Sequence, residues 1–305
     1  MAIYPALFGH VELPDSPGTP RPPARQPSEP VVTTFQTPGK VRMRISIGSG
    51  DVQVASHVEP RVDVELIPLR NDEITRTAID EAVVEASERG DRTEIVVEIQ
   101  RKGGWGFLGR GPSVGVRVHC PQDTAAEVTT ASADVTTRGE LGDIEVKSAS
   151  GDVAVETVGS LRAATASGDV SAAEVRGETN VKTASGDVEI RLAHGALSLN
   201  LASGDARVGE AKAAVSVATV SGDQEIRAVE AGEVKLQSVS GDVRVGVWPG
   251  RRLWIDATSV SGSMTSELPM ETGIEGAGGG DPEIELRART VSGDVRIVRA
   301  APAHV

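Results

Sequence analysis

The residues with the clearest capacity for chemistry are aspartates that recur at regular intervals, most of them directly after serine and glycine. If the repeated units stack in register, neighbouring carboxylates lie ~5 Å apart and repel by roughly 1 kcal/mol in water, and by a few times that at an effective dielectric constant near 20. We expect each carboxylate to accept backbone N–H bonds from its own turn, as in an Asx-turn, with Ser263 imitating this arrangement where aspartate is absent. The aspartates are Asp51, Asp134, Asp152, Asp169, Asp187, Asp205, Asp223, Asp242 and Asp294.

A bound cation is the second explanation for such a column of carboxylates. Calcium takes carboxylate and carbonyl oxygens as ligands. Calcium-binding β-rolls, however, use glycine-rich nonapeptide repeats with a different spacing, whereas each repeat here offers one carboxylate at this position. The pattern therefore favours local hydrogen bonding and predicts no metal site, with a calcium-binding repeat rod as an alternative.

A catalytic constellation is not evident in the sequence. A Ser-His-Asp site needs a histidine near a serine, but the histidines are scattered and the repeated serines are explained by turns. Polysaccharide cleavage needs paired acids in a groove, usually with aromatic platforms, and the repeats lack aromatics. The glycines from Gly276 to Gly280 are not followed by the Lys-Ser/Thr of a phosphate-binding loop. Cys120 lies in a strand-like pattern and is predicted to be a packing residue. We predict no catalytic residue, no cofactor and no enzymatic activity. The histidines are His10, His57, His119, His194 and His304.

Four aromatic residues outside the repeats are the candidate partner contacts. Trp105 and Phe107 lie in the glycine-rich segment 103–111, and an exposed aromatic side chain buries a large area when it docks. The alternative for Trp105 is that it plugs the end of the core. Tyr4 and Phe8 belong to an apolar N-terminal peptide, which is either a docking peptide or a frayed terminus.

The elements that would position these residues come from an internal repeat. A Ser-Gly-Asp step recurs about every 18 residues from position 133 to 241 and then at longer intervals. A fixed period of this size indicates a solenoid, in which each unit buries its apolar face only against its neighbours. The glycines of the step, or the residue that replaces one, are Gly50, Ala133, Gly151, Gly168, Gly186, Gly204, Gly222, Gly241, Gly262 and Gly293. Glycine supplies a positive φ, so the turn at Ala133 must differ or be strained.

Each repeat contains two short strands. Apolar and polar residues alternate in 187–192 and again in 196–201, with a turn between them. Period-two alternation indicates strands with one buried face. The position five residues before each glycine is apolar, and the position three before is mostly serine or threonine, whose hydroxyls can bond the turn backbone or one another. The fold class is therefore predicted to be all-β, a parallel β-solenoid with about 18 residues per coil.

The chain divides into a tail and one solenoid domain. Residues 1–30 hold the apolar tip and a proline-rich linker and are predicted to be disordered; residues 31–300 form the solenoid; 301–305 are a C-terminal tail. An insertion at about 71–90 is predicted to be a helix, capped by Asn71 or Asp72 and ending near Gly90, that covers an open edge or one side of the solenoid. Its apolar stripe is Ile74, Ala78, Ala82 and Ala86. Further loops are the aromatic segment 103–111 and the glycine-rich segment 263–283.

Composition excludes several classes of function. The 305 residues carry a net charge of −13, which argues against nucleic-acid binding and against purely electrostatic binding to anionic membranes. Aromatic residues make up 2% of the chain, so the core must be built from Val, Leu, Ile and Ala. No signal peptide or transmembrane segment is visible, and the expected location is cytoplasmic.

The Ser-Gly-Asp-Val units, with the final Arg287–Ile297 run, resemble the bacterial β-strand-repeat family labelled "putative adhesin", a domain of unknown function. The resemblance covers roughly residues 33–300. It implies a β-solenoid and brings no catalytic residues. An adhesin must be exported, and the sequence departs from the label because it shows no export signal.

Together these features predict a non-enzymatic interaction or scaffold protein that binds a protein or cell-envelope partner through its sheet faces and loops. One alternative is an end-to-end polymerising scaffold, by architectural analogy with bactofilins. Others are the calcium-binding rod and an exported adhesin. The sequence leaves homo-oligomerisation open.

Overall fold

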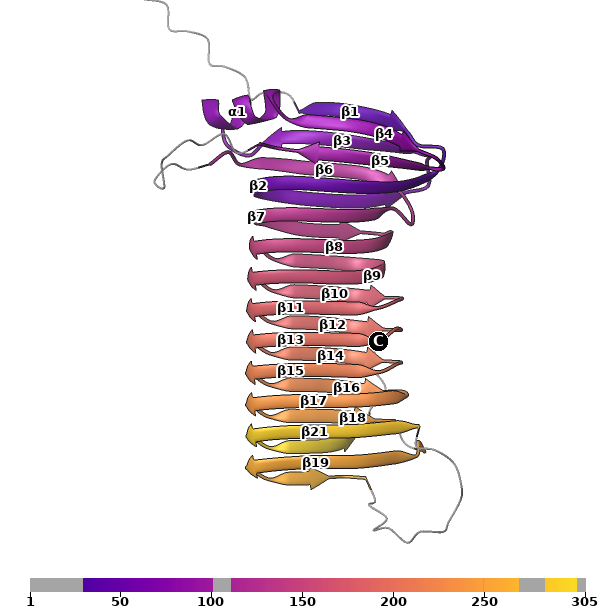
Figure 1. Cartoon of the computed structure of the whole chain (residues 1–305), viewed down its shortest axis with the longest axis vertical. Coiled ribbons are helices and arrows are strands. Elements are labelled where there is room, and N and C mark those ends of the chain that lie inside the picture. The colour runs from indigo at the N-terminus through magenta and orange to yellow at the C-terminus, as the bar shows by residue number, and fades with distance from the viewer. Residues whose placement is uncertain (1–29, 101–110, 249, 269–282, 301–305) are drawn as a thin grey trace, which may run out of the picture.

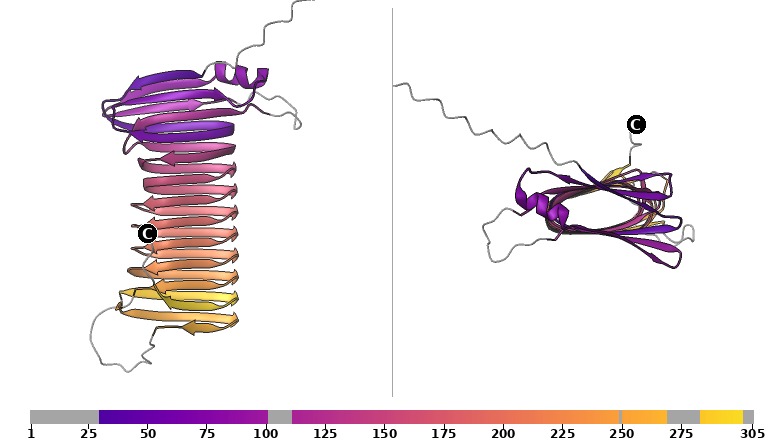
Figure 2. Two further views of the ribbon diagram at one scale, coloured as in Figure 1. Left: turned by 180° about the vertical axis from the view of Figure 1, so that it is seen from behind. Right: turned by 90° about the horizontal axis from the view of Figure 1, so that it is seen from above.

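The computed structural model describes residues 30–100, 111–248, 250–268 and 283–300. These residues form an elongated rod of stacked strands with one short helix at the end where the N-terminal strands lie (Figure 1). Viewed along the rod, two walls of strands enclose a narrow oval interior (Figure 2). The prediction of an all-β parallel β-solenoid is confirmed. The strands are β1 (Val31–Gln36), β2 (Lys40–His57), β3 (Arg61–Pro68), β4 (Val83–Arg89), β5 (Arg92–Glu98), β6 (Val114–Pro121), β7 (Ala125–Arg138), β8 (Glu140–Ser150), β9 (Val153–Ser167), β10 (Val170–Val175), β11 (Thr179–Ser185), β12 (Val188–Ala193), β13 (Leu197–Ser203), β14 (Ala206–Ala211), β15 (Val215–Ser221), β16 (Gln224–Val229), β17 (Gly232–Ser240), β18 (Val243–Val247), β19 (Leu253–Ser261), β20 (Met264–Ser266), β21 (Ile284–Ser292) and β22 (Val295–Arg299).

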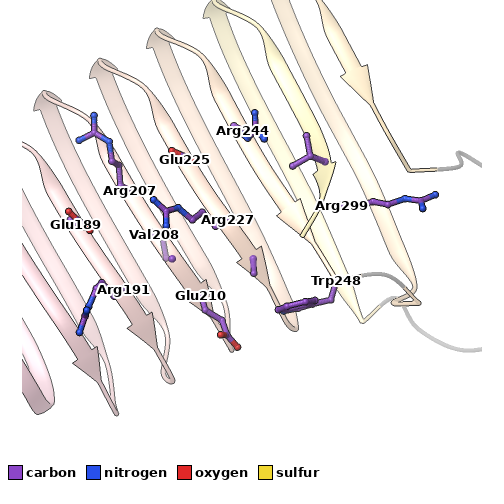
Figure 3. Close-up of a pocket in the computed structure, with 13 residues that line it drawn as sticks. Glu189, Arg191, Arg207, Val208, Glu210, Glu225, Arg227, Arg244, Trp248 and Arg299 are labelled. Carbon is purple, nitrogen blue, oxygen red and sulfur yellow. The ribbon is translucent and has the colours of Figure 1, made fainter. Parts of the chain in front are cut away.

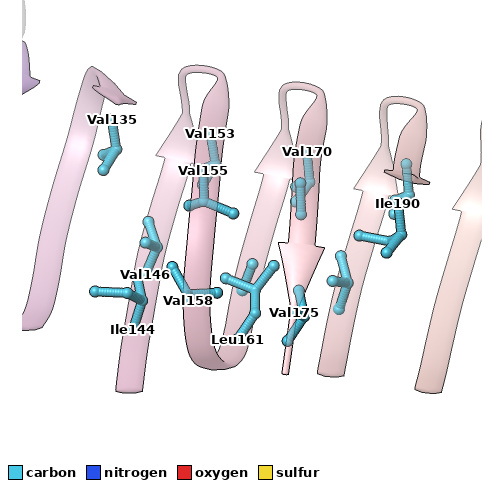
Figure 4. Packing of buried hydrophobic residues seen from close by; sticks show 14 of the residues in the cluster. Val135, Ile144, Val146, Val153, Val155, Val158, Leu161, Val170, Val175 and Ile190 are labelled. Carbon is cyan, nitrogen blue, oxygen red and sulfur yellow. The ribbon is translucent and has the colours of Figure 1, made fainter. Parts of the chain in front are cut away.

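The repeats stack in parallel and in register. Val181 of β11 lies opposite Leu199 of β13, which in turn lies opposite Val217 of β15. All three side chains are buried, as the alternating pattern requires. Figure 4 shows the equivalent packing around Ile144, Leu161 and their neighbours, where aliphatic side chains from both walls fill the interior. The predicted apolar column is therefore the core.

The glycine corner is required by its backbone geometry. Gly186 has a φ of 142°, and a Cβ there would lie 2.2 Å from the carbonyl oxygen of Gly168 in the preceding coil. Any side chain would therefore collide with the backbone of the stacked corner. Ala133 avoids this problem because it is not in the positive-φ region; β7 runs through its corner as one continuous strand. The turn at Ala133 differs from the others, as expected.

Antiparallel strands terminate the parallel stacking at the N-terminal end. β2 is the first complete coil, with β5 on its first half and β6 on its second half, both parallel. β4 then pairs with β5, and β3 with β6, in antiparallel fashion, and β1 pairs with β3. The rod therefore ends here in hairpin-like pairings that no other coil repeats.

The helix of the insertion is shorter than predicted. Helix α1 spans Glu73–Asp80 and packs beside β3; its N-cap is Asp72, whose carboxylate accepts a hydrogen bond from the backbone N–H of Thr75 at 2.7 Å. Residues 83–89, predicted to continue the helix to Gly90, instead form β4. The β-branched pair at its start favours a strand, and Gly90, with a φ of 66°, turns the chain directly into β5. Ala82 and Ala86 therefore do not belong to a helical stripe.

The last two coils are stacked out of sequence order. β21 lies between β17 and β19, and β22 pairs with both β18 and β20. The coil that ends the rod is therefore 253–266, not the final coil of the sequence (Figure 1). The burial of the two strands follows from this order. Ile284 and Leu286 of β21 are covered on both sides and fully buried, whereas Leu253 and Ile255 of β19, at the end of the rod, are only partly buried.

Candidate binding groove

The repeated aspartates form a hydrogen-bonded ladder along one corner of the rod. The Oδ1 atom of Asp187 accepts a hydrogen bond from the backbone N–H of Asp205 in the next coil, at 2.9 Å. Eight bonds of this type, 2.8–3.0 Å long, run from Asp134 to Ser263. The carboxylates were expected to accept N–H bonds of their own turns. The acceptor-donor pairs instead join neighbouring coils, because parallel stacking brings each corner N–H over the carboxylate of the adjacent coil.

Two of these carboxylates carry additional charge compensation. The pKa of Asp187 is lowered, first by the hydrogen bond from the Asp205 backbone and then by Arg207, which donates to both Asp187 and Asp205. The pKa of Asp294 is lowered by the N–H and hydroxyl of Ser263, with a smaller contribution from Arg296. Ser263 therefore acts as a donor that ends the ladder and does not replace the carboxylate. Among the described residues no cluster of His, Cys, Asp or Glu has the arrangement of a metal site.

The column of hydroxyls lies inside the rod, as predicted, but only part of it is hydrogen-bonded. Thr219 donates to Ser238 at 3.3 Å, and Ser259 donates to the carbonyl of Gly293 at 2.9 Å. Within the described ranges, several other members have no hydrogen-bond partner: Thr130, Ser148, Thr165, Thr183 and Thr290. These small side chains fill the narrow space behind the corner, and their role is packing.

The four aromatic residues predicted to contact a partner cannot be placed. Trp105 and Phe107 fall in 101–110 and Tyr4 and Phe8 in 1–29, which lie outside the described residues. Their role stays a prediction.

A groove with a volume of about 630 Å³ lies on the outer face of the wall formed by β12, β14, β16, β18 and β22. Outward positions of successive strands line it, and Figure 3 shows their side chains distributed across these neighbouring strands. Gly209 lines the groove without a side chain, which leaves a depression between the neighbouring strands. A Cβ at Gly209 would lie 2.3 Å from the carbonyl oxygen of Arg191, so the backbone requires glycine at this point of the groove. The lining residues are Glu189, Arg191, Arg207, Val208, Gly209, Glu210, Glu225, Arg227, Ala228, Arg244, Trp248, Val298 and Arg299.

The charges of the groove are opposite to those of the whole protein. Five arginines and three glutamates line it, although the chain carries a net charge of −13. Arg207 is held by the aspartate ladder. In the described part of the chain, the side chains of the other four have no ion pair within 4.0 Å. Their guanidinium groups are available to a ligand, because each presents five N–H donors in a planar fork. The four are Arg191, Arg227, Arg244 and Arg299.

An aromatic side chain lines one side of the groove. Trp248 follows β18 directly, is half-buried, and lies on the same side of the groove as Glu210 (Figure 3). Val298 of β22, also half-buried, is a second apolar lining residue. The groove therefore combines a flat apolar surface with unpaired cationic groups that can orient a ligand.

A family model matches the repeated units of the chain over most of its length. The family model described as "Toastrack DUF4097" matches residues 57–298, which is most of the chain. The chain belongs to the Toastrack DUF4097 family. A search of curated proteins finds no match.

Solved structures similar to this Toastrack chain come from several bacteria. A "putative lipid binding protein" of Parabacteroides distasonis is 17% identical, with 88% of this chain and 97% of that chain covered and a TM-score of 0.46. A "putative adhesin" of Bacteroides fragilis is 12% identical, with 90% and 100% covered and a TM-score of 0.42. The family match over residues 57–298 confirms the resemblance to the bacterial repeat family at the level of the family.

The sequence of this Toastrack chain contains a pattern that indicates the groove, but the pattern lies in the outward positions and not in the buried ones. Arginine recurs at outward positions of the strands after the Ser-Gly-Asp step, at 191, 207, 227, 244, 296 and 299. Trp248 lies where the 18-residue period is interrupted, outside the regular repeats that the sequence pattern describes. None of the helices in the described ranges could cross a membrane.

Proposed function

We propose that this protein is a non-enzymatic interaction protein, a rigid rod that binds a protein or cell-envelope partner through the face that carries the groove. The observation that carries the proposal is the set of four unpaired arginines around a depression that backbone geometry enforces. Exposed, unpaired arginines beside a tryptophan are the residue types enriched in binding hot spots. In-register strands on both sides hold these residues in fixed positions, so little ordering entropy is lost on binding.

The described nucleophiles and bases support a non-catalytic role. Cys120 is buried in the core, and burial raises the pKa of its thiol to about 12, which leaves no reactive thiolate near neutral pH. His194 bonds Glu174 at 3.0 Å on the surface, with no nucleophilic side chain completing a triad among the described contacts.

The N-terminal end of the rod supports a discrete rod over the filament alternative. End-to-end stacking requires a free coil at each end, and β1, β3, β4 and α1 close this end with antiparallel pairings. Electron microscopy at several protein concentrations tests this, and long filaments of the full chain would favour the bactofilin-like scaffold. Fractionation of the producing bacterium tests the expected cytoplasmic location against export.

Binding to fractionated cell envelopes tests the proposal. The wild-type rod is compared with Arg227→Glu, which reverses a groove charge, and with Lys235→Glu, an exposed change on the opposite wall. We expect retention on the envelope or on a purified partner to fall at least about tenfold for Arg227→Glu and to be unchanged for Lys235→Glu. Equal retention of all three proteins would overturn the role of the groove. Circular dichroism melting checks that both variants fold.

A further inference from the structure

We infer that the groove binds a linear polysaccharide that carries carboxylate groups. This inference rests on the proposed function and names the chemistry of the ligand. It follows from four features of the groove: the unpaired arginines, their spacing, the tryptophan and the interleaved glutamates.

The arginines indicate a planar anion. Arg191, Arg227, Arg244 and Arg299 have no ion pairs within the described residues, so their charges are uncompensated at a site in an acidic protein. A guanidinium group and a carboxylate match as two parallel N–H···O bonds. The ligand is therefore expected to present carboxylates, each to one arginine.

The spacing of the arginines indicates a ligand with charges in a row. Arg191 and Arg227 occupy equivalent outward positions two coils apart, on either side of Gly209. With strands ~4.8 Å apart, this places their backbones roughly 10 Å apart along the rod. Arg244 of β18 and Arg299 of β22 lie on the next two strands and extend this row of arginines along the rod. A polymer that lies along the rod axis, across the strands, meets these groups one after another.

Trp248 and the glutamates indicate sugar rings and not a simple polyanion. The half-exposed indole offers a flat apolar surface against which a ring with its C–H bonds can pack. Glu189, Glu210 and Glu225 have no ion pairs among the described contacts and are acceptor-only groups. They can accept hydrogen bonds from the hydroxyl groups of sugar rings, donors that a polyphosphate lacks along its chain.

Other polymers suit the groove less well. An extended acidic peptide commonly binds by adding a strand to a free sheet edge. β14 and β16 are each paired on both sides, so the groove floor offers no such edge. A nucleic acid requires a concentrated basic face, and here three glutamates lie among the arginines.

Calorimetric titration of the full chain with polymers of defined chemistry tests the inference. The carboxylated polymers are polygalacturonate, alginate and hyaluronate; dextran has rings without charge, and polyphosphate has charge without rings. We expect at least one carboxylated polymer to bind about tenfold or more tightly than polyphosphate, and dextran not to bind. Trp248→Ala and the double variant Arg191→Ala/Arg227→Ala should each weaken that binding at least about fivefold, with Lys235→Ala unchanged.

Several outcomes would overturn the inference. Dextran binding as tightly as the carboxylated polymers would remove the role of the arginines. Polyphosphate binding equally well, with Trp248→Ala unaffected, would show general electrostatic attraction. No binding of any carboxylated polymer, while Arg227→Glu still abolishes envelope retention, would refute the ligand class and leave the proposed function standing. If no carboxylated polymer binds and Arg227→Glu also leaves envelope retention unchanged, both the ligand class and the proposed function are refuted.

Discussion

Substitution of Asp187 tests whether hydrogen bonds between coils stabilise the corner of the rod. Alanine removes the Oδ1 acceptor of the Asp205 N–H and the ion pair with Arg207, whereas asparagine keeps an oxygen acceptor and loses only the charge. Both substitutions relieve the same repulsion from the neighbouring aspartates. The difference between the two variants therefore isolates the hydrogen bond.

The expected magnitude follows from the geometry. A hydrogen bond to a charged group contributes about 1.5–3 kcal/mol. The Asp187 side chain is 48% exposed, so water can partly replace it, and we take about 1 kcal/mol for the bond. The exposed Arg207 pair adds about 0.2–1 kcal/mol, and relief of repulsion offsets roughly that amount after screening by salt. We expect Asp187→Ala to lower the free energy of unfolding by about 1 kcal/mol, and Asp187→Asn to stay within about 0.5 kcal/mol of the wild type.

Urea unfolding at neutral pH and amide hydrogen exchange provide the assay. The midpoint should fall for alanine at constant m-value, and the amide of residue 205 should exchange faster only in that variant. Glu85→Ala serves as the control, because this exposed carboxylate has no ion pair among the described residues. Equal stability of the alanine and asparagine variants, with unchanged exchange at residue 205, would refute the reasoning.

Three further predictions concern the same corner. Because the pKa values of Asp187 and Asp294 are lowered from 3.8 in the folded protein, their contribution to stability is present above about pH 4 and lost as the pH falls further. The free energy of unfolding should therefore drop in acid, and it should drop less steeply for Asp187→Asn. Parallel pH profiles of the two proteins would contradict this. Gly186→Ala should destabilise the rod by about 1–3 kcal/mol or more, because φ is 142° at this position and the new Cβ would meet the carbonyl oxygen of Gly168. A melting temperature equal to that of the wild type would contradict this prediction. Calcium and chelator should leave the melting temperature unchanged, because the Oδ1 atoms already accept N–H bonds, whereas a rise with calcium concentration would revive the calcium-binding alternative.

The repeat made the fold predictable because one period fixes both strands and both faces of a coil. Alternation at positions such as Val181 and Leu199 determines which side is buried, and the glycine corner determines where the wall changes. The partners of the aspartates were less predictable. A sequence shows that Asp187 follows a turn, but only the stacking distance and register show that its acceptor faces the N–H of the next coil.

The helix boundary and the groove were missed for different reasons. Residues 82–86 contain small and β-branched apolar residues that satisfy both a helical stripe and a short strand, and pairing with β5 decides between them. The groove depends on outward residues of five strands, and its depth depends on Gly209, whose lack of a side chain matters only because the backbone of Arg191 lies directly beside it.

The exchanged order of the last two coils is what completes the groove. Val298 and Arg299 reach it because β22 pairs with β18, beside Trp248. Had the coils stacked in sequence order, β18 would pair instead with β20, a three-residue strand without arginine. One cationic group and one apolar contact would then be missing from the part of the groove near Trp248. The groove is therefore complete only when β21 and β22 have inserted between the neighbouring coils, so binding at this face depends on that insertion.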